Sequence, residues 1–116
     1  MKLIRHGDKG QEKPGLLDSE GNFRDLSSII NDIDGHSLSS DSLALISQVD
    51  ISTLPLLDHG TRLGACVGNI GKLVCIGLNY SDHAKESGMA IPTEPIVFMK
   101  AISAISGPND NIELIR

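Results

Sequence analysis

Short segments with apolar residues are separated by polar turns over the first quarter of the chain, a pattern typical of short strands. Residues 1–5 mix apolar and basic side chains and predict a first strand. Residues 14–17 and 23–26 predict two more. The polar run at 18–22 between them contains Asp, Ser, Gly and Asn, which favour tight turns. The pattern therefore predicts a small meander of three strands.

The spacing of aliphatic residues changes after the third strand. In residues 25–33 they recur at intervals of three and four, which predicts a helix capped by Asp25 or Ser27 and ended by Gly35. Residues 40–49 show the same spacing and predict a second helix. The first part of the chain is thus expected to combine strands and helices.

Strand and helix patterns return in the second part of the chain. Residues 72–78 form a continuous apolar run of strand length, as expected of a buried strand. A helix is predicted over residues 79–87, with Asn79 as its cap. A short strand is predicted over residues 96–99, and a further strand is expected to begin at 112–115.

A domain boundary is predicted near residue 70, because glycines at positions 64, 68 and 71 interrupt regular structure there. A chain of 116 residues has room for one small domain and the beginning of another. The sequence therefore predicts an α+β protein. A small N-terminal domain is expected over residues 1–70, and the beginning of a second domain over residues 71–116.

Composition and charge exclude several classes of partner. Hydrophobic residues make up 40% of the chain but aromatic residues only 3%, so the core is expected to consist of Ile, Leu and Val. A net charge of −5 without a basic block argues against nucleic acid and against an anionic membrane surface. No apolar run approaches the roughly 20 residues of a membrane span. Since no export signal is present, Cys66 and Cys75 are expected to be buried, reduced thiols in a cytoplasmic protein, with a disulfide as the alternative.

Side chains able to do chemistry concentrate between residues 77 and 108. His83 and Glu86 lie three positions apart in the predicted helix, so they share a face with Cβ atoms about 5–6 Å apart. A carboxylate beside an imidazole fixes its tautomer and raises its basicity, which suits a histidine that takes a proton from water. The alternative interpretation is a solvated pair on a charged helix face.

The other candidate residues allow two interpretations each. Lys100 ends an apolar strand, and either binds an anionic substrate group or extends into solvent. Tyr80 is the only tyrosine, and either lines a pocket or packs in the core. His6, His36 and His59 lie in turns rich in Gly and Asp, where exposed histidines are expected. The sequence contains neither a phosphate-binding glycine loop nor a GxSxG motif.

Three consecutive motifs resemble those of the fumarylacetoacetate hydrolase family. They read KLVCIGLNYSDHAKESG, IPTEPIVFMK and SAISGPNDNIEL, and together cover roughly residues 72–115. The preceding segment, MKLIRHGDKGQEKPGLLDSEGNFRDL, is similar to the small N-terminal domain of one bacterial branch. That branch is described as ureidoglycolate lyase-like or 2,4-diketo-3-deoxy-L-fuconate hydrolase-like.

The resemblance implies a small N-terminal α/β domain followed by the first strands and helix of a mixed β-roll catalytic domain, incomplete here. It implies a metal-dependent hydrolase or lyase that cleaves a C–C bond of a small 2-keto or diketo acid. His83 would be the general base and Glu86 its orienting carboxylate, with Tyr80 and Lys100 lining the substrate pocket. The family holds Mg²⁺ or Mn²⁺ with a Glu-x-Glu pair and an Asp, which are expected beyond Arg116.

The resemblance also implies the partners of the whole protein. The substrate would be a keto acid or ureidoglycolate, and the full-length protein would be a homodimer that binds neither nucleic acid nor membrane. Without metal ligands, the 116-residue chain alone is expected to be inactive. The alternative function is a non-catalytic α+β binding or interaction module, which has no need of the His83–Glu86 pair.

Overall fold

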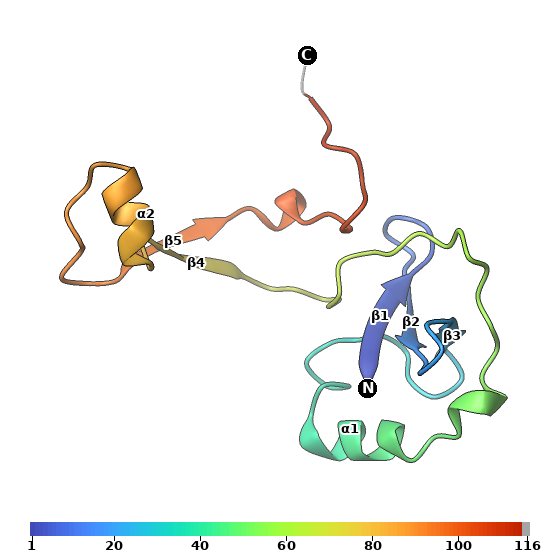
Figure 1. Ribbon diagram of the computed structural model, residues 1–116. Coiled ribbons are helices and arrows are strands. Elements are labelled where there is room, and N and C mark those ends of the chain that lie inside the picture. Colours follow the sequence, from blue (N-terminus) through green and yellow to red (C-terminus); the bar gives the residue numbers. More distant parts are fainter. Residues whose placement is uncertain (115–116) are drawn as a thin grey trace. The chain divides into compact units, whose positions relative to one another are not determined.

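The computed structural model describes residues 1–114 and confirms an α+β chain (Figure 1). It divides into two compact units, the first formed by residues 1–69 together with 106–114, the second by Ile70–Ile105. The first unit is therefore built from two segments that flank the second in sequence. The elements in chain order are β1 (Lys2–His6), β2 (Lys13–Leu17), β3 (Phe23–Asp25), α1 (Ser40–Ser47), η1 (Ile51–Thr53), β4 (Leu73–Gly77), α2 (Ser81–Glu86), β5 (Ile96–Lys100) and η2 (Ile102–Ala104).

The first unit contains the predicted three-stranded meander. β2 pairs antiparallel with β1 and with β3, so β2 is the central strand. The turn between β2 and β3 is organised by Asp18, whose Oδ1 accepts the N–H groups of Glu20 and Asn22 at 2.9 and 2.8 Å. The backbone N–H of Asn22 and the guanidinium of Arg24 lower the pKa of Asp18 to about 2. The turn prediction for residues 18–22 is confirmed.

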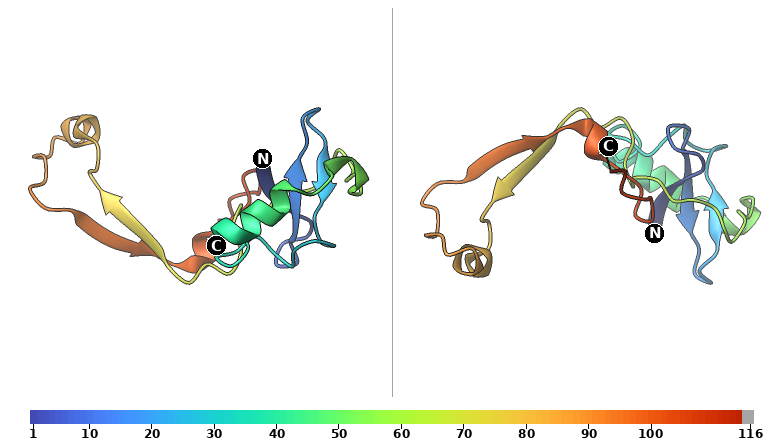
Figure 2. Two further views of the ribbon diagram at one scale, coloured as in Figure 1. Left: turned by 90° about the horizontal axis from the view of Figure 1, so that it is seen from below. Right: turned by 90° about the horizontal axis from the view of Figure 1, so that it is seen from above.

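An aliphatic core joins the sheet to α1, which lies against it (Figure 2). The helix is capped by Ser39, whose hydroxyl accepts the backbone N–H of Ser42. The cluster contains no aromatic side chain, in keeping with the composition. Its buried members are Leu16, Leu26, Ile46 and Leu54, with Leu3, Ile30, Leu43 and Val49 packed against them.

The helix predicted over residues 25–33 is wrong. Asp25 is the last residue of β3 and donates its N–H to the Pro55 carbonyl at 2.9 Å. Leu26 donates its N–H to the Pro14 carbonyl, also at 2.9 Å. A single hydrogen-bonded turn and irregular chain follow. Tertiary hydrogen bonds therefore override the helical spacing of the aliphatic residues.

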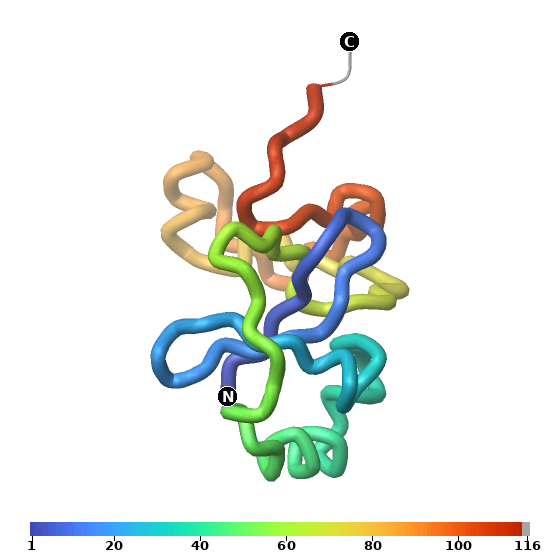
Figure 3. The backbone as a smooth tube through the Cα atoms, turned by 90° about the vertical axis from the view of Figure 1, so that its right-hand side faces the viewer, coloured from blue at the N-terminus to red at the C-terminus, as the bar shows by residue number. Residues whose placement is uncertain are grey.

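His6 is buried, contrary to the exposure predicted for it. Residues 62–64 run beside the end of β1, where Gly64 donates its N–H to the Arg5 carbonyl at 2.8 Å (Figure 3). The imidazole is only 5% exposed, and its Nε2 atom has no hydrogen-bond partner within the part of the chain that the structure describes. His36 and His59 are exposed, as predicted.

Residues 106–114 are tied to the rest of the first unit by ion pairs. Arg62 donates two hydrogen bonds to Asp110, at 2.8 and 2.7 Å, and one to Glu12 at 2.9 Å. These contacts raise the pKa of Arg62, and Arg62 together with the Gly107 N–H lowers the pKa of Asp110 to about 2. Of the strand expected at 112–115, residues 112–114 show no strand, and Ile115 lies outside the described residues.

The second unit is an antiparallel hairpin of β4 and β5 with α2 in its connection. The strand predicted at residues 72–78 is confirmed as β4, but its predicted burial is wrong, because Val74 and Ile76 are about half exposed. Every residue of its partner β5 is exposed. The two cysteines are free, but Cys66 in the first unit is exposed rather than buried, and Cys75 is half-buried.

Within residues 1–114, every helix is too short or too polar to cross a membrane.

Candidate functional site

α2 is set up by the turn that follows β4. Leu78 adopts a positive φ of 46°, which reverses the chain immediately after the strand. Tyr80 is then the N-cap in extended conformation and makes no side-chain capping bond, so the predicted cap at Asn79 is wrong. Gly88, with φ 65°, ends the helix, and its N–H bonds to the Lys85 carbonyl at 3.1 Å. A short helix is thereby fixed at both ends.

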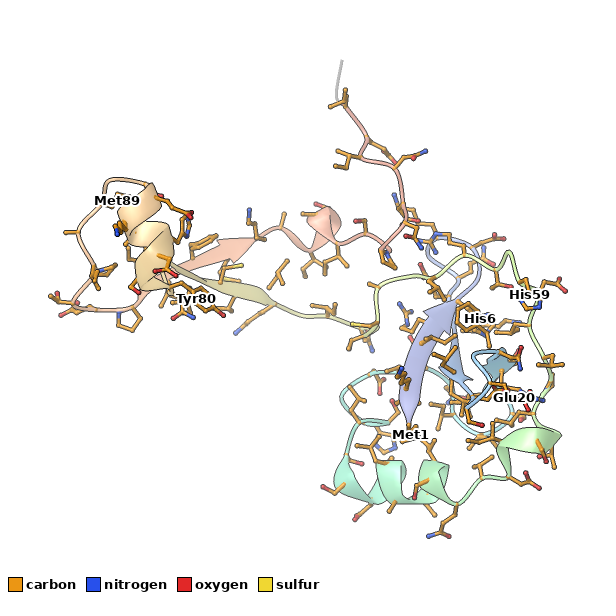
Figure 4. The ribbon with its side chains drawn as sticks, viewed as in Figure 1. Met1, His6, Glu20, His59, Tyr80 and Met89 are labelled. Carbon is orange, nitrogen blue, oxygen red and sulfur yellow. The ribbon has the colours of Figure 1, made fainter. Side chains whose placement is uncertain are left out.

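Three of the predicted site residues lie on this helix or at its start. His83 and Glu86 are three positions apart, which places them on neighbouring positions of one face. Tyr80 lies one turn before His83 and is 74% exposed (Figure 4). The adjacent Ala84 is fully buried, so the helix directs its alanine inward and its polar residues outward. His83 and Glu86 are both exposed.

Lys100 lies at the opposite end of the hairpin. It pairs with Leu73 at the start of β4, whereas Gly77 at the α2 end of β4 pairs with Ile96. Lys100 lies four positions after Ile96 in the strand, which corresponds to about 13 Å along the hairpin. The Lys100 Nζ atom lies 5.9 Å from the centre of the Phe98 ring, a cation–π contact. The structure thus brings Tyr80, His83 and Glu86 together but not Lys100.

A metal site requires at least three converging ligands. Among residues 1–114, no three His, Cys, Asp or Glu side chains gather closely enough to hold a metal ion. The residues present therefore do not fit a Mg²⁺ or Mn²⁺ centre by themselves, since such centres need several oxygen ligands in fixed geometry.

Sequence reasoning missed two features of the first unit. One is the clamp of Arg62 on Glu12 and Asp110, which joins residues up to 50 positions apart and leaves no local spacing signal. The other is a cavity of about 380 Å³ between residues 29–37 and α1. The polar residues Asn, Asp and Ser that precede α1 could have indicated an irregular, cavity-forming segment. The spacing of the aliphatic residues at 25–33 predicted a helix there instead.

Comparison with known proteins connects the second unit to a family. Residues 72–116 match the family model described as fumarylacetoacetate (FAA) hydrolase C-terminal. Proteins named "Putative hydrolase" from Burkholderia lata, Burkholderia orbicola (strain MC0-3) and Burkholderia cenocepacia (strain HI2424) are each 54% identical to the chain over 114 residues. The match covers 98% of this chain but only 40% of each relative.

The chain therefore spans about two fifths of the length of these relatives. The family match includes all of β4, α2 and β5, and so all four predicted site residues. Over residues 72–116 the chain is thus similar to the fumarylacetoacetate hydrolase family, and over nearly its whole length it is similar to part of proteins named as hydrolases.

Proposed function

We propose that this chain is the N-terminal part of a fumarylacetoacetate hydrolase-family enzyme that hydrolyses a C–C bond of a small 2-keto or 2,4-diketo acid. One observation carries the proposal: the segment that matches the family model contains the whole of α2, with His83 and Glu86 on one face. Such a pair supplies a proton acceptor and the carboxylate that orients it.

In the proposed reaction His83 accepts a proton from a water molecule, and the water oxygen attacks the carbonyl carbon at C4 of a 2,4-diketo acid. The C3–C4 bond then breaks, its electron pair passes to C3, and the fragment leaves as an enolate. Protonation at C3 by the histidine yields the 2-keto acid and a carboxylic acid. Glu86 holds the imidazole in the required tautomer throughout.

We also propose substrate contacts for the other two residues. Tyr80 lies one turn from His83 and presents its phenol to solvent, so we assign it to the reacting end of the substrate. For Lys100 we propose a contact with an anionic substrate group on the chemistry of its ammonium alone, since its position at the far end of β5 does not bring it to α2. Ureidoglycolate is the second substrate class of this proposal, with lyase in place of hydrolase chemistry.

The proposal assigns the metal to the full-length protein. We propose that the ligands of Mg²⁺ or Mn²⁺ lie outside residues 1–114, in which no three candidate ligand side chains come together. We further propose that the full-length enzyme is a cytoplasmic homodimer.

The test compares His83→Ala and Glu86→Gln in the full-length protein. Loss of the enol absorbance of 2,4-diketo acids, and consumption of ureidoglycolate, are followed with and without Mg²⁺ or Mn²⁺. We expect His83→Ala to lower kcat by at least about 100-fold, the usual contribution of general-base catalysis. Asp82→Asn is the matched control for Glu86→Gln, because it removes a carboxylate from the same helix.

The control is expected to leave kcat unchanged. Unaltered turnover in a folded His83→Ala protein would eliminate this residue as the base. Absence of turnover of either substrate class by the unsubstituted full-length protein would count against the activity itself.

A further inference from the structure

The cavity of the first unit is formed by two elements, each of which contributes both polar and aliphatic side chains. Residues 29–37 contribute one wall and α1 the other, and the volume of about 380 Å³ is within the range of small-molecule sites. None of its lining residues belongs to the segment that carries His83 and Glu86. The cavity is therefore separate from the site of the proposed function.

One wall of the cavity carries a net negative charge. Of its two carboxylates, Asp32 is neutralised by Arg5, which donates hydrogen bonds of 2.7 and 3.1 Å to it. Within the part of the chain that the structure describes, Asp34 forms no ion pair with an arginine or a lysine, and the titratable neighbour beside it in the lining is His36. The Oδ1 atom of Asp34 accepts the backbone N–H groups of Ser37 and His36, at 3.1 and 2.9 Å, and these bonds lower its pKa. Asp34 thus stays ionised at neutral pH, with Oδ2 not used by these two bonds.

Aliphatic side chains in contact with water also line the cavity, beside the polar residues Asn31, His36, Ser37 and Ser42. Leu45 of α1 is 67% exposed and Ile29 is 45% exposed, although both lie beside the buried Ile46. A ligand that covers such apolar side chains is bound more tightly, because removing apolar surface from water is favourable by about 25 cal/mol per Å². A ligand suited to this cavity therefore combines a hydrocarbon chain with a positive charge.

We propose that this cavity binds a small organic cation, with a primary ammonium group on the Asp34 carboxylate and a short alkyl chain against Ile29 and Leu45. A compact ammonium donates up to three hydrogen bonds and matches a single carboxylate oxygen. The same carboxylate repels keto acids and other anions. The cavity therefore takes a different chemical class from the substrate of the proposed enzyme.

The experiment titrates the 116-residue chain with n-hexylamine at neutral pH and follows backbone amide resonances by NMR. Hexanoate is the control of opposite charge and 1-hexanol the neutral control. We expect hexylamine to shift the resonances of residues 29–37 and 42–46 with saturation, and hexanoate to leave them in place. Equal shifts with hexanoate, or hexylamine shifts located elsewhere, would overturn the proposal.

Two substitutions assign the contacts. Asp34→Asn keeps an oxygen acceptor for the Ser37 and His36 N–H groups but removes the charge, and is expected to weaken hexylamine binding about fivefold or more. Asp41→Asn, a carboxylate of α1 outside the lining, is the matched control and should leave the affinity within about twofold. Leu45→Ser tests the alkyl wall independently, since this exposed residue does not support the core. Unchanged affinity in both Asp34→Asn and Leu45→Ser would refute the site.

Discussion

The two units differ in where they keep their apolar side chains. The first unit buries Leu16, Leu26 and Ile46 in a common cluster and secures its second segment with the Arg62–Asp110 pair. In the second unit, Ala84 is the only fully buried apolar residue. β4 alternates between half-buried and exposed residues, and β5 is exposed throughout. An isolated two-stranded hairpin is marginally stable in water. The unit that carries the candidate chemistry thus contributes little stability of its own.

The largest expected effect comes from truncating a buried side chain in the core of the first unit. Leu16→Ala removes a fully buried side chain from β2 and is expected to lower the free energy of unfolding by about 2–5 kcal/mol. Val97→Ala changes an exposed residue of β5 and should alter it by less than about 0.5 kcal/mol. Urea denaturation followed by circular dichroism measures both. Equal effects would show that the two units share one core.

Acid should loosen the first unit before the second. Asp18 and Asp110 both have pKa values of about 2 in the folded chain, below the ordinary value of 3.8. A lowered folded-state pKa stabilises the fold above the ordinary value, and this stabilisation is lost as pH falls from about 4 to about 2. We expect the protection factors of the Asn22 and Gly107 amides, that is, their exchange rates corrected for the intrinsic rate at each pH, to fall in this range, and the protection factor of Met89 in the second unit to fall less.

Asp110→Asn is the control for the acid experiment. It removes the charge at all pH values, so Gly107 should exchange faster than in the unsubstituted chain at pH 6, and the difference should disappear near pH 2. A difference that persists at pH 2 would contradict the assignment of this titration to Asp110.

The smallest expected effect is confined to α2. Gly88→Ala forces a residue with a Cβ into the left-handed region at φ 65°, although the space around it is open. Its cost is about 1 kcal/mol, and it should reduce the protection of the Met89 amide about fivefold. Gly71→Ala is the matched control, because that glycine also has open space but no positive φ. Equal exchange in the two variants would rule out a strained helix end.

Local patterns predicted most of the regular elements to within a few residues. The turn at 18–22 could be predicted because Asp18 bonds to backbone groups only two and four positions away. α1 and α2 follow from short-range spacing and from capping or glycine-ended turns. For the same reason, the sequence could predict that His83 and Glu86 share a face. Their catalytic roles stay predictions.

The failures share a long-range cause. The helix expected at 25–33 is absent because Asp25 and Leu26 bond to backbone carbonyls of other segments. His6 is buried because a segment 57 positions away pairs with the end of β1 at Leu63. Neither partner is visible in the local sequence. The separation of Lys100 from α2 follows from strand register, which the hydrophobic pattern of a hairpin with one fully exposed strand does not specify.

The first unit consists of two chain segments that are connected through the second unit. The Arg62–Asp110 clamp also joins these two segments directly, by side chains. A protease that cuts between Gly88 and Pro95 would divide the chain into two peptides. The clamp, together with the Lys9–Glu113 pair, would then hold the shorter peptide on the longer one. The protein is in this sense a natural candidate for fragment complementation, with the exposed loop of the second unit as the place to split it.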